Sequence, residues 1–260
     1  MTPRSRQSVS VVIPTKNAAA LLPDCLASVA WADEIVVVDR FSDDGTVALC
    51  SGTPNCRVFQ REAMIASNRN FGFDQATSDW ILRLDADERI TPELAEELQR
   101  LLVDPPDDVT GWESQERVFV LGRELTHGFG RPHDRKMMFR RGMAREPERS
   151  EHDALETSGT WLRTRNGYIH YNYERVRDYL VKTNYYTDTD VANAALPERA
   201  PSPLVGVREA ARSGYVYYLK LGGYRDGWVG FVDAGMRALY QFVQWAKLRE
   251  RWERERGGSA

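Results

Sequence analysis

Two alternating patterns of apolar residues occupy the first hundred positions of the chain. Strands are predicted at 9–14, 34–39, 56–60 and 79–85, and the continuous apolar run at 34–39 is typical of a buried parallel strand. Helical spacing of apolar residues, or helix-favouring composition, falls between these strands at 19–32, 45–50, 64–76 and 91–102. This alternation predicts an α/β fold in which a mostly parallel sheet is flanked by helices on both faces.

The pattern changes after the Pro- and Asp-rich stretch at 104–108. Residues 111–125, 135–142 and 166–173 are expected to be extended and antiparallel, and 175–196 to be helical. A linker at 197–203 then leads to a helical tail. The chain is therefore expected to have an α/β domain over 1–173, in two halves at about 8–103 and 104–173, and a helical extension over 174–260.

The tail carries an apolar stripe at helical spacing within 228–250. Its members are Val229, Val232, Met236, Leu239, Tyr240 and Val243. Three interpretations stay open: packing on the α/β domain, a homo-oligomer interface, and docking on a membrane surface. The last is favoured by Trp228, Trp245 and Trp252 with nearby Lys and Arg, and disfavoured by Asp233 and the Glu residues of the tail.

Composition narrows the class of protein. The formal net charge is −3 with acids and bases interspersed, which gives no basic field for nucleic acid. Three cysteines lack metal-type spacing, and the four histidines are not spaced as zinc ligands. The start of the chain is unlike a signal peptide, and we find no uncharged run of 18 residues. A cytoplasmic protein is expected, either free or peripheral at the inner face of the membrane.

Polar residues follow three of the predicted strands. "PTKN" follows the first, "DRFSDDGT" the second and "DADE" the fourth. In open parallel sheets, ligands bind beyond the carboxyl ends of the strands. Three polar segments that follow strands at one edge of the sheet therefore predict a binding site at that edge.

Asp85 and Asp87 form a D-x-D pair at the end of the fourth strand. Two carboxylates in such a turn can bind one hard cation, and Mg²⁺ or Mn²⁺ suits them when phosphates supply the remaining ligands. An acidic start to the next helix is the alternative, but Thr91 and Pro92 already suit the N-cap and first position. Glu88 and Arg89 remain open between a structural pair and a catalytic one.

Asp39 ends the second strand, where a carboxylate can accept a hydrogen bond from a base N–H or a ribose hydroxyl. Neither the Rossmann nor the P-loop glycine pattern is present, which argues against a nicotinamide enzyme and a P-loop NTPase. A nucleotide is nevertheless expected against Thr15, Asn17 and Asp39, with Arg69 on its diphosphate. A turn acid and a solvated helix residue are the alternatives for Asp39 and Arg69.

The segments "SVVIPTKN", "ADEIVVVDRFSDDGT", "NRNFGFDQATSDWILRLDADERITPELAEE" and "KLGGYRDGWVGF" resemble family 2 glycosyltransferases of the GT-A fold. The similarity is densest over residues 8–103. Within that family, the chain is most similar to the lipopolysaccharide-core β-glucosyltransferase-like branch. The resemblance implies an inverting, metal-dependent transfer of a sugar from a nucleotide-diphosphate sugar, with a UDP-sugar favoured, to an acceptor hydroxyl.

The resemblance also implies roles for individual residues. The nucleoside pocket would be lined by Pro14, Thr15, Asn17 and Asp39, with Lys16 nearby. Arg69 would face the diphosphate, Asp85 the ribose or the metal, and Asp87 would be the more direct ligand of Mg²⁺ or Mn²⁺. A carboxylate base would lie in "SEHDALETSG", where Asp153 matches best, His152 is adjacent and Glu151 competes. An exposed polar loop is the alternative there.

Acceptor contacts are expected in the loop at 127–136, from Arg131 and His133. Trp112 is a further candidate as a stacking face for a sugar, with burial in the core as its alternative. The acceptor itself stays open between a sugar-containing, a lipid-linked and a small-molecule compound.

Two departures from the family pattern bear on the donor pocket. Ala18 replaces the usual acid after "TKN", and Arg40 and Phe41 replace small residues. Two rival functions remain, a sugar-phosphate nucleotidyltransferase and a non-catalytic glycan-binding protein of the same fold. The first lacks its Gly-rich N-terminal loop here, and the intact D-x-D argues against the second.

Overall fold

The computed structural model describes residues 6–148 and 155–256, which fall into two compact units. The first unit comprises Met1–Glu116 and His133–His170, and the second comprises Arg117–Pro132 and Tyr171–Ala260. Residues 117–132 thus group with the C-terminal helices, whereas the sequence placed them in the α/β domain. Each unit is described by itself.

A parallel sheet forms the centre of the first unit. Its strands are β1 (Val9–Thr15), β2 (Glu34–Asp39), β3 (Cys56–Gln60) and β4 (Trp80–Arg83), in the order β3-β2-β1-β4. Every neighbouring pair among them is parallel, and Thr15 lies opposite Asp39 at the carboxyl ends of β1 and β2. The four predicted strands and their parallel pairing are confirmed.

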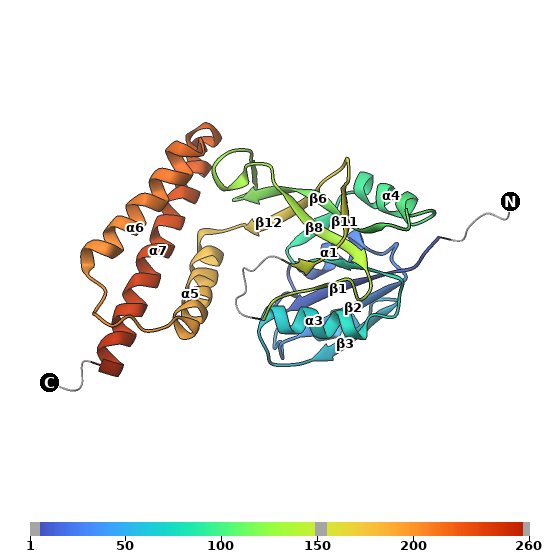
Figure 1. The fold of residues 1–260 in the computed structure, drawn as a ribbon, viewed down its shortest axis with the longest axis horizontal. Coiled ribbons are helices and arrows are strands. Elements are labelled where there is room, and N and C mark those ends of the chain that lie inside the picture. The colour runs from blue at the N-terminus through green and yellow to red at the C-terminus, as the bar shows by residue number, and fades with distance from the viewer. Residues whose placement is uncertain (1–5, 149–154, 257–260) are drawn as a thin grey trace. The chain divides into compact units, whose positions relative to one another are not determined.

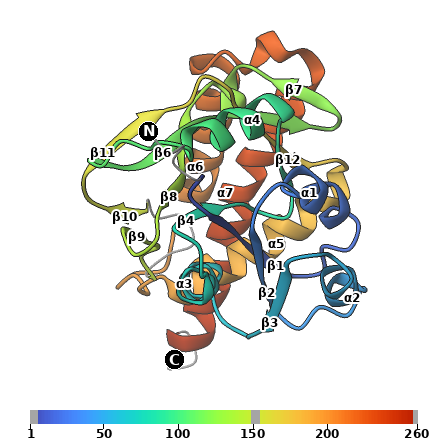
Figure 2. The same cartoon turned by 90° about the vertical axis from the view of Figure 1, so that its right-hand side faces the viewer.

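Helices cover both faces of this sheet. They are α1 (Leu22–Ser28), α2 (Thr46–Ser51), α3 (Ile65–Gln75) and α4 (Pro92–Leu101), and Figure 2 shows α3 on the side opposite α1 and α2. Alternate strand residues feed two cores: Val11 and Val37 belong to the one under α1 and α4, Val12 and Val38 to the one under α3. Strands buried on both faces explain the continuous apolar runs of the sequence.

Helix α3 approaches the sheet at a glycine. A Cβ atom added to Gly72 would lie 2.4 Å from Val12 Cγ1 and 3.2 Å from Val38 Cγ2. Glycine costs helix stability in a helix interior, roughly 1 kcal/mol relative to alanine. Here it allows the helix backbone to come close to β1 and β2.

Antiparallel strands extend the sheet beyond β4. Strand β8 (Asp134–Arg140) pairs with β4, and β6 (Val109–Val120) pairs with β8. Short strand β5 (Glu88–Ile90) pairs with β12 (Tyr168–Tyr173) and was not predicted, because the sequence led directly from "DADE" into a helix. Thr91 then caps α4, its Oγ1 accepting a hydrogen bond of 3.2 Å from Leu94 N, as expected.

Smaller strands complete the first unit. Strand β11 (Thr160–Arg163) pairs in parallel with β6, and β9 (Ala144–Arg145) pairs with β10 (Glu156–Thr157). Together with the helices on both faces of the parallel strands, they give the α/β class expected from the sequence.

The second unit is largely helical (Figure 1). It contains β7 (Arg123–Leu125), η1 (Gly128–Gly130), α5 (Val176–Asn193), α6 (Pro203–Tyr215), η2 (Val216–Lys220), η3 (Gly223–Asp226) and α7 (Gly227–Arg256). Helices α6 and α7 lie side by side in Figure 1, and Gly206 of α6 approaches the ring of Trp245 of α7. No helix in the described ranges is both long and apolar enough to cross a membrane.

The predicted stripe on α7 is only partly buried. Val229 is fully buried with Val118 and Tyr173, and Met236 packs against the same cluster. Buried Asp233 also faces this side, where it pairs with Arg237 and accepts a hydrogen bond from the Tyr173 hydroxyl. Leu239, by contrast, is exposed, so packing within the second unit covers only part of the predicted stripe.

Candidate active site

The loops after β1 and β2 are joined around Asp39. Its carboxylate accepts hydrogen bonds from Thr15 Oγ1 at 3.0 Å, from Ser42 N at 2.8 Å and from Gln60 Nε2 at 3.3 Å. Burial raises the pKa of Asp39, but hydrogen bonds from Ser42, Gln60 and Thr15 outweigh burial and hold it below its ordinary value. Since Asp39 is fully buried, the direct contact with a nucleoside predicted for it is not open in this structure.

Lys16 and Asn17, in the loop after β1, form hydrogen bonds with the loop after β2. Lys16 Nζ donates to the carbonyls of Arg40 and Phe41 at 3.0 and 2.9 Å, and Asp43 N donates to Asn17 Oδ1 at 3.1 Å. Asn17 and Phe41 both have positive φ, 49° and 54°, a sparsely populated conformation for residues other than glycine. The "PTKN" and "DRFSDDGT" loops are therefore one connected structure, with Pro14 just before them at the end of β1.

Arg69 and Asp85 form an ion pair at the carboxyl end of β4. Arg69 Nη2 lies 2.6 Å from Asp85 Oδ1, and Arg135 Nη1 lies 3.6 Å from Asp85 Oδ2. Burial raises the pKa of Asp85, but the two guanidinium groups outweigh it and lower the pKa below its usual value. The structure thus brings Arg69 to the D-x-D turn, and it occupies Asp85 with cationic side chains.

Glu88 is fully buried and pairs with Arg135, not with its neighbour Arg89. Arg135 Nη1 and Nη2 lie 2.7 Å from the two carboxylate oxygens of Glu88. Burial raises the pKa of Glu88 to about 7, with Arg135 opposing the rise. Sequence reasoning missed this pair because Arg135 is 47 residues away on β8 and reaches Glu88 only through the unpredicted strand β5.

A second partner set surrounds Asp87. His170 Nε2 lies 3.6 Å from Asp87 Oδ2, and His170 Nδ1 is hydrogen-bonded to Glu116. His133 Nε2 also contacts the Glu116 carboxylate, at 2.6 Å. Burial lowers the pKa of His170, but Asp87 and Glu116 outweigh it and raise the pKa to about 10. Burial likewise raises the pKa of Glu116, and hydrogen bonds from His133 and His170 bring it well below its ordinary value.

These contacts define the charged cluster of the first unit: Arg69, Asp85, Asp87, Glu88, Glu116, His133, Arg135 and His170. Within residues 6–148 and 155–256, one ligand atom each of Glu88, Glu116 and His170 lies within 4.8 Å of the others. Sequence reasoning did not identify Glu88, Glu116 or His170 as site residues. His170 follows "NGYI" on a strand, and its distance along the chain from the other histidines is not typical of metal ligands. The sequence therefore did not identify it.

Glu146 connects the cluster to the segment that precedes residue 149. It pairs with Arg83 and, at 3.6 Å, with Arg69 Nη1. Its backbone N and O bond with the Asn70 amide at 2.9 and 2.8 Å, and Asn70 also donates to Glu148 Oε1. The base candidates Glu151, His152 and Asp153 lie outside the described residues, so their prediction stays untested.

The three acceptor candidates have different surroundings. Trp112 is 1% exposed and packs on Trp80 with ring centroids 4.6 Å apart, so the prediction of a sugar-stacking face is wrong and its alternative, a core tryptophan, holds. His133 joins the charged cluster through Glu116. Arg131 is exposed and belongs to the second unit.

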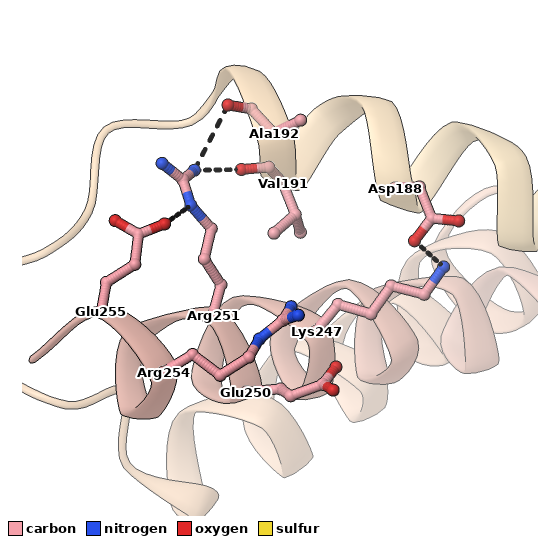
Figure 3. Close-up of a pocket in the computed structure, with 8 residues that line it drawn as sticks. All are labelled: Asp188, Val191, Ala192, Lys247, Glu250, Arg251, Arg254 and Glu255. Carbon is pink, nitrogen blue, oxygen red and sulfur yellow. Dashed lines mark hydrogen bonds and ion pairs between the residues drawn. The ribbon is translucent and has the colours of Figure 1, made fainter. Parts of the chain in front are cut away.

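A cleft between α5 and α7 of the second unit is lined by charged side chains (Figure 3). Lys247 pairs with Asp188 at 2.7 Å, and Arg251 pairs with Glu255 and donates to the Val191 carbonyl. These cations join the two helices to each other. The cleft therefore reflects helix packing, and the chemistry of the site lies in the first unit.

Comparisons with known proteins identify the family of the chain. The family model described as "Glycosyl transferase family 2" matches residues 10–154. The lipopolysaccharide core biosynthesis glycosyltransferase LpsC of Rhizobium meliloti is 27% identical over 94% of this chain and 92% of its own length. An uncharacterized glycosyltransferase of Rickettsia bellii is 23% identical over 94% and 87%. The crystal structure of S. aureus TarS 1-349 in complex with UDP-GlcNAc aligns with a TM-score of 0.45 at 15% identity, covering 95% and 92%.

Proposed function

Because the chain belongs to glycosyl transferase family 2 and is a glycosyltransferase of GT-A fold, we propose that it transfers a sugar from a nucleotide-diphosphate sugar to an acceptor hydroxyl with inversion. One observation carries the proposal: at the carboxyl edge of a parallel sheet, the Arg69–Asp85 pair lies beside the Asp87–His170–Glu116 set. The Arg69–Asp85 pair offers a guanidinium group to a diphosphate, and the Asp87–His170–Glu116 set offers ligands to a metal.

The donor nucleotide is proposed to bind over the loops after β1 and β2. Lys16 and Asn17 order these loops, and Thr15 and Asp39 hold their base. Arg69 reaches a diphosphate by exchanging part of its pairing with Asp85, since guanidinium groups bind phosphate oxygens in the same forked geometry as carboxylates. A UDP-sugar is the favoured donor, as the sequence resemblance implies.

The residues around Asp87 fit a divalent cation. Asp87 Oδ2 and His170 Nε2, 3.6 Å apart, can both lie within the metal–ligand distance of about 2.1 Å from one ion. Glu116 on Nδ1 leaves Nε2 as the atom that would bind the metal, which would displace the proton that Nε2 shares with Asp87. Asp85 is engaged by two arginines, so we assign the direct contact to Asp87. When bound, Mg²⁺ or Mn²⁺ supplies positive charge against the leaving diphosphate.

The base is proposed to come from residues 151–153, with Asp153 first and Glu151 and His152 as competitors. Support comes from Glu148, whose carboxylate accepts a hydrogen bond from Asn70, the residue after Arg69. Asp153 is five residues after Glu148, and an extended chain of about 3.5 Å per residue places it within ~18 Å of Glu148. A carboxylate that meets the acceptor hydroxyl opposite the leaving group would take its proton as the new glycosidic bond forms. A sugar-containing acceptor is proposed, in line with the name of LpsC.

Calorimetry of UDP with and without Mn²⁺ tests the donor and metal assignments. The wild type should bind UDP more tightly with Mn²⁺, and Asp87→Ala should lose that metal-dependent gain. Asp107→Ala, an exposed acid of the first unit, serves as the matched control and should behave as wild type. If the wild type binds no UDP in either condition, the proposed donor site is wrong. Product stereochemistry with a UDP-sugar then tests inversion.

A further inference from the structure

The second unit exposes a group of large apolar side chains where α6 turns into α7. We call Tyr215, Leu219, Tyr224, Trp228 and Phe231 the hairpin tip, and each is about half exposed or more, up to 63% for Phe231. The ring of Tyr218 joins them, with centroids 6.3 Å from Tyr224 and 5.7 Å from Phe231. A contiguous exposed aromatic group on a soluble domain is typical of an interaction surface.

Two basic side chains lie beside the hairpin tip. Lys220 and Arg225 are exposed, and Asp226 is the acid next to them, whereas Arg212 is already paired with Glu209 at 2.7 Å. Asp226 is 7% exposed and already accepts hydrogen bonds from the backbone N–H groups of Thr126 and His127. The tip therefore presents aromatic rings beside basic groups whose nearby carboxylate is turned inward.

We propose that the hairpin tip docks on the surface of a bilayer that contains anionic phospholipid. Trp and Tyr side chains favour the headgroup region, and Lys and Arg beside an apolar face are attracted to anionic lipid. A second copy of the chain fits less well. A two-fold interface would bring Lys220 and Arg225 against the same residues on the partner, and the carboxylate of Asp226 is already occupied.

Co-sedimentation with vesicles tests the docking, with phosphatidylcholine alone compared with phosphatidylcholine plus phosphatidylglycerol. The wild type should bind the anionic vesicles, and less so at high salt. Trp228→Ser with Phe231→Ser should reduce the partition coefficient at least about tenfold, because two buried aromatic side chains are lost from the lipid interface. Lys220→Gln with Arg225→Gln should remove the preference for anionic vesicles.

Leu49→Ser with Val103→Ser, two exposed apolar positions of the first unit, is the matched control and should leave vesicle binding unchanged. Absence of wild-type binding, or equal binding by the aromatic variant, would overturn the proposal. Sedimentation velocity adds a third outcome that overturns it: a wild-type dimer that the aromatic variant converts to monomer, which would make the tip a self-interface. No donor, metal or acceptor enters the assay, so its result is independent of the proposed reaction.

Discussion

The charged cluster of the first unit and the hairpin tip of the second depart from the usual distribution of side chains in opposite directions. The cluster buries carboxylates and guanidinium groups, such as Glu88 with Arg135, and each charged group named in it has an oppositely charged neighbour. The tip exposes rings such as Phe231 that elsewhere would lie in a core. Buried charge and exposed apolar area both cost stability in the isolated protein, so both indicate regions adapted to a ligand.

The largest difference between the two regions should appear on removing a buried charge partner. Arg135→Met leaves Glu88 buried without its guanidinium, and we expect a loss of about 3–5 kcal/mol in the free energy of unfolding. Urea denaturation measures it. Arg145→Met, which breaks an equally well-formed but exposed pair with Asp74, is the control and should cost less than ~1 kcal/mol. Equal losses would mean that burial does not distinguish the cluster.

Asp39→Asn should have the next largest effect. It removes charge-assisted hydrogen bonds to a buried carboxylate, and a loss of about 2 kcal/mol at neutral pH is expected. Because the folded pKa of Asp39 lies below the unfolded one, its stabilisation is present above the unfolded pKa and disappears as the pH falls through the folded pKa. Thermal unfolding from pH 7 downward should therefore show wild type and variant converging in acid. A constant difference would contradict this.

Glu116→Gln should weaken Mn²⁺ binding about tenfold, equivalent to ~1.4 kcal/mol, if the metal binds as proposed. Glutamine no longer offers a charged partner to His170 Nδ1. Titration calorimetry of Mn²⁺ in the presence of UDP measures the change. Glu113→Gln, three residues earlier on β6 and on the other face of the strand, should bind Mn²⁺ as wild type does. Unchanged binding by Glu116→Gln would leave Glu116 with a purely structural role.

The smallest effect is expected at the hairpin tip. Phe231→Ser should change the free energy of unfolding by less than ~0.5 kcal/mol, since the ring is 63% exposed. Val229→Ala, two residues earlier on the same helix but fully buried, should cost about 1.5–3 kcal/mol. Thermal melts of the two variants test the contrast. A large loss at Phe231 would show that the ring supports the fold of the second unit.

The two regions also differ in how far the sequence revealed them. The parallel strands, the α4 cap and the D-x-D turn follow from local patterns, and the chain belongs to the predicted family and fold. Strand β5 is only three residues long and includes Glu88 and Arg89, so no apolar pattern predicted it. The pairing of Glu88 with Arg135, and of Asp87 with His170, joins residues 47 and 83 positions apart, a separation that local patterns do not encode.

The stripe on α7 and the role of Trp112 show two other limits of local sequence patterns. A helical stripe predicts which residues share a face, and the face with Val229 is indeed buried. The spacing does not show what covers each member of the stripe, and Leu239 stays exposed. Trp112 was considered for an acceptor role because size and ring chemistry alone do not distinguish a core tryptophan from a binding one.

Gly72 sets a limit on how the donor site can evolve. Arg69 lies one turn before it on α3, and the helix rests on Val12 and Val38 with no room for a β-carbon. Any side chain at this position would push α3 outward and carry the Arg69 guanidinium away from Asp85. The position of Arg69, proposed above to bind the diphosphate, therefore depends on a residue that has no side chain of its own.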